Sequence, residues 1–189
     1  MSRHSFVEFA IRYEGCSATG NQCGDYLRLM SRGVETDQVR KDMARMSSCA
    51  LFVRALWWCF GAEHAVYDKP YSCRAPQDVI AVAKDRGAYR SGTSIGASAA
   101  PDVGDAFHIA TMDGKREHFG IFTRKYVTSP GSWMFDTVEG GQGQGGTSIG
   151  TTTRTLVKNG MWTVTGDRVL VAWFDFDALG LPGLRAGWA

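Results

Sequence analysis

Apolar residues in the first half of the chain recur at helical spacing. Phe6, Phe9, Ala10 and Tyr13 stand at i, i+3, i+4 and i+7, which predicts an amphipathic helix. Four later stretches also have a helical pattern: 25–30, 39–46, 49–60 and 76–86. We therefore expect the first half of the chain to be mainly helical.

The stretch 49–60 is the most apolar of these predicted helices. Ser47 and Ser48 precede it, and serine is a favoured N-cap residue, while Gly61 is a stop signal after it. Apart from Arg54 its residues are apolar on nearly every side. We therefore expect this helix to lie at the centre of the fold.

After Gly92 the pattern changes to short segments of β-type composition. Six of them are predicted as strands: Ala106–Thr111, His118–Arg124, Ser132–Glu139, Thr151–Val157, Met161–Thr165 and Val169–Phe176. Asp113-Gly114 indicates a tight hairpin between the first two. Helices followed by strands predict an α+β fold, with the N-terminal helices packed on one side of a C-terminal antiparallel sheet.

Length and composition restrict the class of protein. The chain has 189 residues, 44% hydrophobic and 21% charged, which predicts one globular domain spanning 1–189. The net charge of +2 argues against a strongly basic nucleic-acid-binding protein. No apolar run approaches the roughly 18 residues of a membrane-spanning helix, so no membrane insertion is expected. Residues 1–13 lack the apolar core of a cleavable signal peptide.

Cys49 is the thiol best placed for chemistry among five cysteines, an odd number that leaves at least one outside any disulfide. It stands at the first turn of the predicted helix 49–60, where unpaired backbone N–H groups and the helix dipole favour an anion. Because the thiolate is the reactive form of cysteine, this position favours a nucleophile. The alternative is a small buried core residue.

The remaining cysteines permit two other interpretations. Cys16 and Cys23, or either of them with Cys73, can form a disulfide in an oxidising compartment. Cys59, His64 and Cys73 can supply metal ligands, but their spacing matches no recurrent zinc pattern and a fourth ligand is undefined. We therefore expect neither a metal nor a cofactor.

A nucleophilic cysteine needs a base, which is usually a histidine. His4 lies in an N-terminal region expected to be exposed, and His64 follows the far end of the helix that begins at Cys49. His108 and His118 lie on neighbouring predicted strands and are the candidates. Next to the second of them, Gly120 leaves room for another element to approach closely.

A third group must orient the base, and two carboxylates on a nearby predicted strand qualify. These are Asp136 and Glu139, three residues apart. On a regular strand an interval of three places them on opposite faces, so at most one can face the histidine.

Five short motifs follow one another in an order that resembles the CHAP and NlpC-type cysteine peptidases, a papain-like superfamily. They are Ser48–Val53 (SCALFV), Pro101–Phe107 (PDVGDAF), His118–Phe122 (HFGIF), Thr137–Gly141 (TVEGG) and the terminal strand from Asp167 (DRV). The resemblance spans residues 5 to 178. It implies a papain-like α+β fold, with Cys49 as nucleophile, His118 as base and Glu139 as the orienting residue.

One position departs from the resemblance. Gly141 stands where CHAP members often carry an asparagine, and Gln142 or Gln144 could replace that side chain. Residues 140–150 hold six of the 23 glycines, which predicts a flexible hairpin loop beside Glu139.

The resemblance implies a peptidoglycan hydrolase that cleaves an amide bond in the wall's peptide stems. Without a signal peptide, we expect delivery from the cytoplasm to the periplasm or wall by a secretion system or a holin. The chain is then an injected antibacterial toxin, with an immunity protein as partner, or a phage lysin.

Two alternatives stay open. One is a cysteine protease, deamidase or acyltransferase acting on protein. The other is a non-catalytic module that binds glycan or peptide through aromatic residues such as Trp133 and Trp162.

Overall fold

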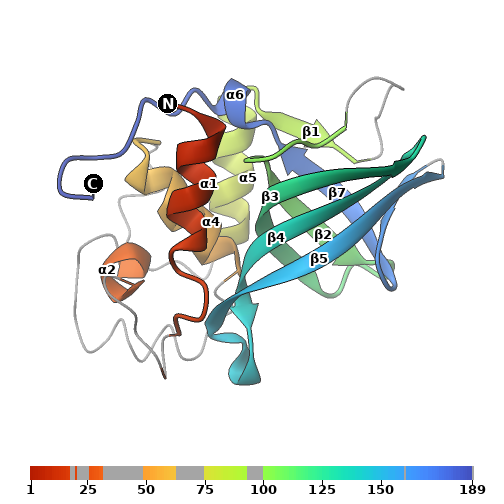
Figure 1. Cartoon of the computed structure of the whole chain (residues 1–189), viewed down its shortest axis with the longest axis horizontal. Helices are drawn as coiled ribbons and strands as arrows, with labels where there is room; N and C mark the ends of the chain where they lie inside the picture. The colour runs from red at the N-terminus through yellow and green to blue at the C-terminus, as the bar shows by residue number, and fades with distance from the viewer. Residues whose placement is uncertain are drawn as a thin grey trace.

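A computed structural model of the chain describes residues 1–17, 20, 26–31, 49–62, 75–92, 100–159 and 161–188. The helices are α1 (Arg3–Ile11), α2 (Tyr26–Ser31), α4 (Cys49–Cys59), α5 (Ala75–Asp85) and α6 (Phe176–Leu179). The strands are β1 (Tyr89–Ser91), β2 (Ala106–Thr111), β3 (Glu117–Ser129), β4 (Ser132–Gln142), β5 (Ser148–Asn159), β6 (Met161–Val164) and β7 (Arg168–Phe174). The helices lie together on one side and the strands on the other (Figure 1).

The strands form a closed antiparallel barrel. Their order is β1-β7-β2-β3-β4-β5-β6, and β6 also pairs with β7, which closes six strands into a ring and leaves β1 outside it. One edge of β7 pairs with β2. The other edge is shared between β6, which pairs at Arg168 and Val169, and β1, which pairs at Ala172–Phe174.

The predicted papain-like α+β fold, with helices on one face of an open sheet, is therefore wrong. The long strands β3 and β4 carry register shifts that bend them, at 122–124 and 127–129 on β3 and at 139–142 on β4. The bent sheet meets itself between β6 and β7, so the sheet has an enclosed inner face as well as a face turned to the helices.

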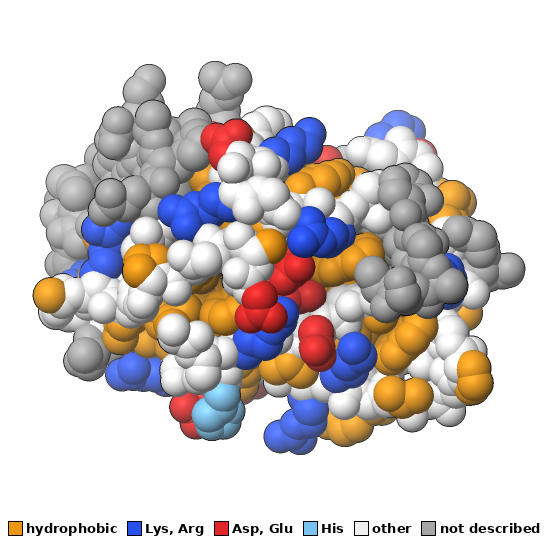
Figure 2. All heavy atoms as spheres, turned by 90° about the horizontal axis from the view of Figure 1, so that it is seen from above, with side chains coloured by type: hydrophobic (Ala, Val, Ile, Leu, Met, Phe, Trp, Pro, Cys, Tyr) orange, Lys and Arg blue, Asp and Glu red, His pale blue; other side chains and the backbone are white. Residues whose placement is uncertain are grey.

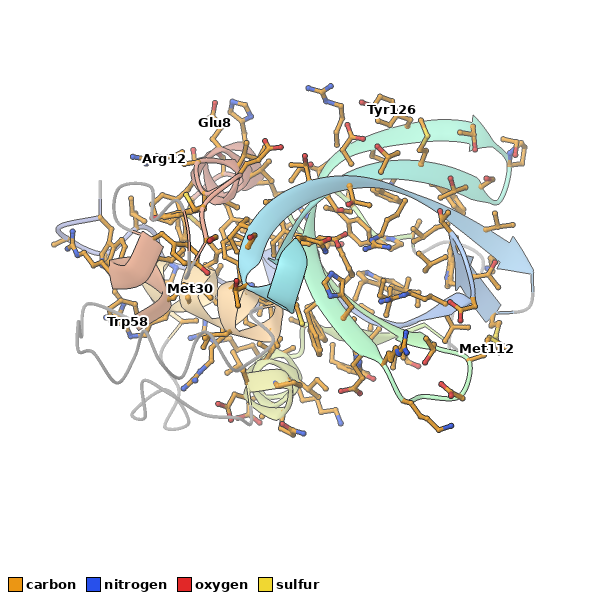
Figure 3. The ribbon with its side chains drawn as sticks, turned by 90° about the horizontal axis from the view of Figure 1, so that it is seen from below. Glu8, Arg12, Met30, Trp58, Met112 and Tyr126 are labelled. Atoms are coloured by element: carbon orange, nitrogen blue, oxygen red, sulfur yellow. The ribbon has the colours of Figure 1, made fainter. Side chains whose placement is uncertain are left out.

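Aromatic side chains fill the barrel. The rings of Phe107, Phe122 and Phe135 contact one another in a row of tilted pairs, with ring centroids 4.9 Å and 4.4 Å apart. The same buried cluster contains Ile109, Leu156, Trp162, Val164, Leu170 and Trp173. Figure 3 shows side chains from the surrounding strands converging inside the curved ribbon, whereas Tyr126 points away from it. A packed apolar interior is what makes closure of the barrel favourable.

A second core joins the helices to the outside of the barrel. Helix α4 packs against β3, β4 and α5, and its Trp57 ring lies 5.7 Å from that of Phe174 on β7. Every residue of α4 except Trp58 is buried, Arg54 included, as its almost entirely apolar sequence predicts. The central position of this helix is thus confirmed.

Element positions agree closely with the sequence pattern. Strand β2 has the predicted bounds, and the other predicted helices and strands within the described residues differ from the observed ones by a few residues at their ends. The short elements β1 and α6 were not predicted. The predicted helix 39–46 lies outside the described residues.

Arg3 ties the first helix to the end of the barrel. Its guanidinium donates to Asp105 Oδ1 and to the Val103 carbonyl, both at 2.6 Å, and to Asp177 Oδ2 at 2.8 Å. Figure 2, which views this end of the molecule, shows charges of both signs interspersed with apolar side chains.

Within the described residues, no helix has the length and apolar character needed to span a membrane.

The closed barrel predicts a large energetic difference between two positions on β3. Phe122 is buried in the interior, whereas Val127 is 74% exposed. We expect Phe122→Ala to lower the free energy of unfolding by about 3–5 kcal/mol, and Val127→Ala to change it by about 0.5 kcal/mol or less. Urea unfolding followed by circular dichroism measures both. Equal, small losses would contradict a packed interior.

Candidate active site

Cys49 is the first residue of α4 and lies where this helix packs on β3 and β4. Its side chain is buried, with 4% of the residue exposed, and it is a thiol rather than half of a disulfide. As the first residue of the helix it has a backbone N–H without an intrahelical acceptor. The thiol therefore stands at the positive end of the helix dipole.

His118, near the start of β3, links this thiol to a carboxylate. Its side chain is hydrogen-bonded to that of Cys49. Its Nε2 lies 2.7 Å from Glu139 Oε2. With Nε2 held by the carboxylate, Nδ1 is the ring nitrogen left for the thiol. Burial lowers the pKa of His118, but the hydrogen bonds and charges of Cys49 and Glu139 outweigh it and leave that pKa raised.

Glu139 on β4 is fully buried, yet its carboxylate is surrounded by donors. Arg154 on β5 donates from Nε to Oε1 at 2.5 Å and from Nη2 to Oε2 at 2.6 Å. The Thr137 hydroxyl donates to Oε1 at 2.5 Å. Burial raises the pKa of Glu139, but His118 and Arg154 together lower it from 4.5 to about 2. The carboxylate is thus ionised at neutral pH.

Gly120 makes the close approach of these strands possible. It pairs with Phe107 across β2 and β3. A Cβ at this position would lie 2.6 Å from Phe107 Cζ and 2.7 Å from Glu139 Cγ. Any side chain at 120 would therefore displace the carboxylate or the barrel core, which confirms the expected need for space at this glycine.

A β-bulge brings one more polar side chain, that of Gln142, to the same place. Glu139 pairs with Gly150 and Gln142 with Ser148, so β4 has one residue more than β5 between these pairs. Gly141 accommodates the bulge with φ of 73°, a left-handed conformation that favours glycine. Because of the extra residue, Gln142 turns to the same side as Glu139. Its Nε2 lies 3.0 Å from Glu139 Oε2 and 3.2 Å from His118 Nε2.

The structure thus brings Cys49, His118 and Glu139 into contact, and their catalytic roles stay predictions. Asp136, the other carboxylate considered, lies away from this cluster. It accepts hydrogen bonds from Tyr126 at 2.9 Å and Thr153 at 2.8 Å. The two carboxylates face opposite ways, as their interval of three predicts.

The other histidines lie apart from Cys49 or outside the described residues. His108 is buried and stacks on Phe119 with ring centroids 4.4 Å apart, and its Nε2 is 3.2 Å from Glu117. Burial lowers the pKa of His108 despite that carboxylate. His4 is exposed beside Glu8, at 3.0 Å.

Sequence reasoning missed Arg154. A signal existed in the spacing along the strand. Thr152, Arg154 and Leu156 are two residues apart and so share one face, and the apolar Leu156 marks that face as the inward one. Inward placement of an arginine requires a buried anion as partner. Which anion it meets depends on strand pairing, which the sequence pattern does not specify.

The structure describes only part of the alternative disulfide, metal and aromatic sites predicted from the sequence. Cys16 is disulfide-bonded, while Cys23, His64 and Cys73 lie outside the described residues. The described segments contain no cluster of metal-ligating side chains. Trp162 is 1% exposed and lies in the barrel core against Trp133, with ring centroids 4.7 Å apart.

Comparisons with known proteins identify no relative of this chain. No protein-family model matches the sequence, and neither a curated protein nor a solved structure is significantly similar to it. The resemblance to the cysteine peptidases therefore rests on the short motifs alone.

Steric crowding at Gly120 predicts a large effect for one added methyl group. Gly120→Ala should lower the free energy of unfolding by about 1–3 kcal/mol, because the methyl group overlaps Phe107 and Glu139. Gly150→Ala is the matched control, since its Cβ would meet only the Gln142 side chain, at 3.3 Å. Denaturant unfolding compares the two variants. A loss at Gly150 as large as that at Gly120 would contradict the crowding argument.

The low pKa of Glu139 predicts how its contribution to stability depends on pH. Glu139→Gln leaves Arg154 buried without its anion, so we expect a loss of about 3–5 kcal/mol at pH 7. The carboxylate's contribution is fully present above pH 4.5 and is lost as pH falls toward about 2. The difference between wild type and variant should therefore shrink below pH 4.5.

Urea unfolding at about pH 7, 5, 4 and 3 measures this difference. Asp136→Asn is the control on the same strand, with an expected loss of about 1 kcal/mol. A Glu139→Gln loss that stays constant from pH 7 to pH 3 would refute a depressed pKa, as would a loss equal to that of the control.

Proposed function

We propose that this protein is a cysteine amidase or endopeptidase that cleaves an amide bond in the peptide stems of peptidoglycan. One observation carries the proposal: the Cys49 thiol contacts His118, which in turn contacts the buried carboxylate of Glu139. A nucleophile, a base and a group that orients the base are the requirements of covalent amide hydrolysis.

In the proposed reaction His118 takes the thiol proton and the Cys49 sulfur attacks the carbonyl carbon of the scissile amide. The carbonyl oxygen becomes an oxyanion, which the backbone N–H of Cys49 helps to stabilise at the helix start. The C–N bond then breaks, and the leaving amine takes the proton from His118. Water, deprotonated by the same imidazole, hydrolyses the thioester and regenerates the thiol.

Glu139 supports this cycle without changing its own charge. Its Oε2 accepts from His118 Nε2, which presents the other ring nitrogen to Cys49 and stabilises the imidazolium that forms. Gln142 donates to the same carboxylate oxygen. Gln142 thus supplies a side-chain amide one residue after Gly141, the position where CHAP members often carry an asparagine.

The substrate assignment is supported by the motif order and by one further observation. Cys16 is disulfide-bonded, and a disulfide persists in an oxidising compartment such as the one where a cell wall is met. A protease, deamidase or acyltransferase acting on protein would use the same thioester chemistry. The identity of the products distinguishes these substrates.

We expect Cys49→Ala to lower release of soluble muropeptides from purified sacculi by about 10³-fold or more, because the nucleophile is lost. Cys59→Ala is the matched control: it removes the buried thiol at the other end of the same helix and should retain release. Mass spectrometry of the products identifies the bond that is cut. Undiminished release by Cys49→Ala would overturn the assignment.

Two further results bear on the alternatives. Iodoacetamide should modify Cys49 well below the ordinary thiol pKa of about 8.5, whereas in a non-catalytic binding module its modification would rise only as the pH approaches that value. Rapid modification of Cys49 without any release of muropeptides would refute the wall substrate and favour another amide.

A further inference from the structure

Arg154 holds the site's carboxylate with a fork of two hydrogen bonds. Its Nε and Nη2 reach the two oxygens of Glu139 at 2.5 Å and 2.6 Å. This planar, bidentate geometry restricts the plane of the carboxylate as well as its position. The oxygen that meets His118, Oε2, is therefore also held by Arg154.

The guanidinium does not come from a directly paired position. Arg154 pairs with Phe135, while Glu139 pairs with Gly150 four residues earlier on β5. The side chain reaches along the inside of the barrel, where its Cζ lies 5.8 Å from the Phe107 ring centroid. Its side chain is 13% exposed and that of Glu139 is fully buried.

An ion pair buried this deeply is expected to add little to the free energy of unfolding. Burying two charges carries a desolvation cost that their attraction often only balances, and apolar residues of similar volume commonly serve as well. Here the pair sits on the one carboxylate that contacts His118. Its position therefore points to the chemistry of the site.

The charges also balance. Four groups from four elements face one another: Cys49 from α4, His118 from β3, Glu139 from β4 and Arg154 from β5. In the thiolate–imidazolium form they carry two negative and two positive charges. Without the guanidinium, one buried negative charge would be uncompensated.

We propose that Arg154 is a positioning residue of this site, whose guanidinium keeps the Glu139 carboxylate ionised and aimed at His118 so that the Cys49 thiolate can form. This inference rests on the proposed thiol chemistry and deepens it. Arg154 acts through Glu139, to which both of its hydrogen bonds in the fork are donated.

Loss of the guanidinium disfavours the thiolate by either of two routes. If Glu139 stays ionised, its uncompensated charge repels the thiolate. If Glu139 takes up a proton instead, His118 loses the anion that stabilises its imidazolium form. The thiolate then loses the imidazolium that stabilises it. Both routes move thiolate formation to higher pH.

The test is the pH profile of Cys49 alkylation by iodoacetamide, followed by mass spectrometry. Arg154→Met should shift the profile's midpoint upward by about one pH unit or more and lower muropeptide release about 10²-fold. Arg154→Lys, which keeps the charge but loses the fork, should shift the midpoint less. Arg90→Met is the control, because Arg90 pairs with Asp175 at 2.9 Å away from the site and should leave the profile unchanged.

Action through Glu139 predicts non-additivity. In a Glu139→Gln background, Arg154→Met should cause no further shift of the midpoint. This double variant also removes both buried charges together, so it keeps the test usable if Arg154→Met alone fails to fold. Thermal unfolding shows which variants are folded.

An unshifted profile in folded Arg154→Met would overturn the inference. A full further shift in the Glu139→Gln background would overturn it as well, because Arg154 would then act independently. Alkylation needs no peptidoglycan. A shift in Arg154→Met together with no muropeptide release by the wild-type protein would therefore sustain the role of Arg154 and refute the wall substrate.

Discussion

The arrangement of this protein depends on one buried anion. Glu139 carries its negative charge where no water reaches it, and that charge persists because His118, Arg154 and Thr137 supply hydrogen bonds from three positions. Because desolvation disfavours the charged carboxylate, each lost hydrogen bond favours uptake of a proton. The ionised state of Glu139 therefore depends jointly on side chains from β3, β4 and β5.

Barrel closure and this anion support each other. Arg154 reaches Glu139 only because β4 and β5 curve together around the aromatic interior, against which its guanidinium lies at Phe107. Gly120 leaves the space that the carboxylate fills, and the bulge at Gly141 turns Gln142 toward it. The apolar core therefore determines the positions of the polar groups, and the helix α4 adds the thiol from outside the ring.

Two kinds of burial serve different purposes in the fold. The aromatic interior and the apolar face of α4 contribute stability by removing apolar area from water. The ionic cluster of His118, Glu139 and Arg154 fixes the geometry of the site, because a charge in low dielectric tolerates few alternative arrangements. The result is a histidine held between a thiol and a carboxylate, and the proposed amide chemistry rests on this arrangement.

Sequence alone determined the local structure and much of the candidate site. Periodicity identified the helix that begins at Cys49 and the strands that carry His118 and Glu139, because side-chain spacing reports directly on which face of an element is apolar. It left the choice between Asp136 and Glu139 open and missed Arg154. Only the tertiary structure decided these points, along with closure of the barrel that replaced the expected open sheet. Pairing between β6 and β7, and the bulge in β4, join residues whose local patterns do not encode their partners.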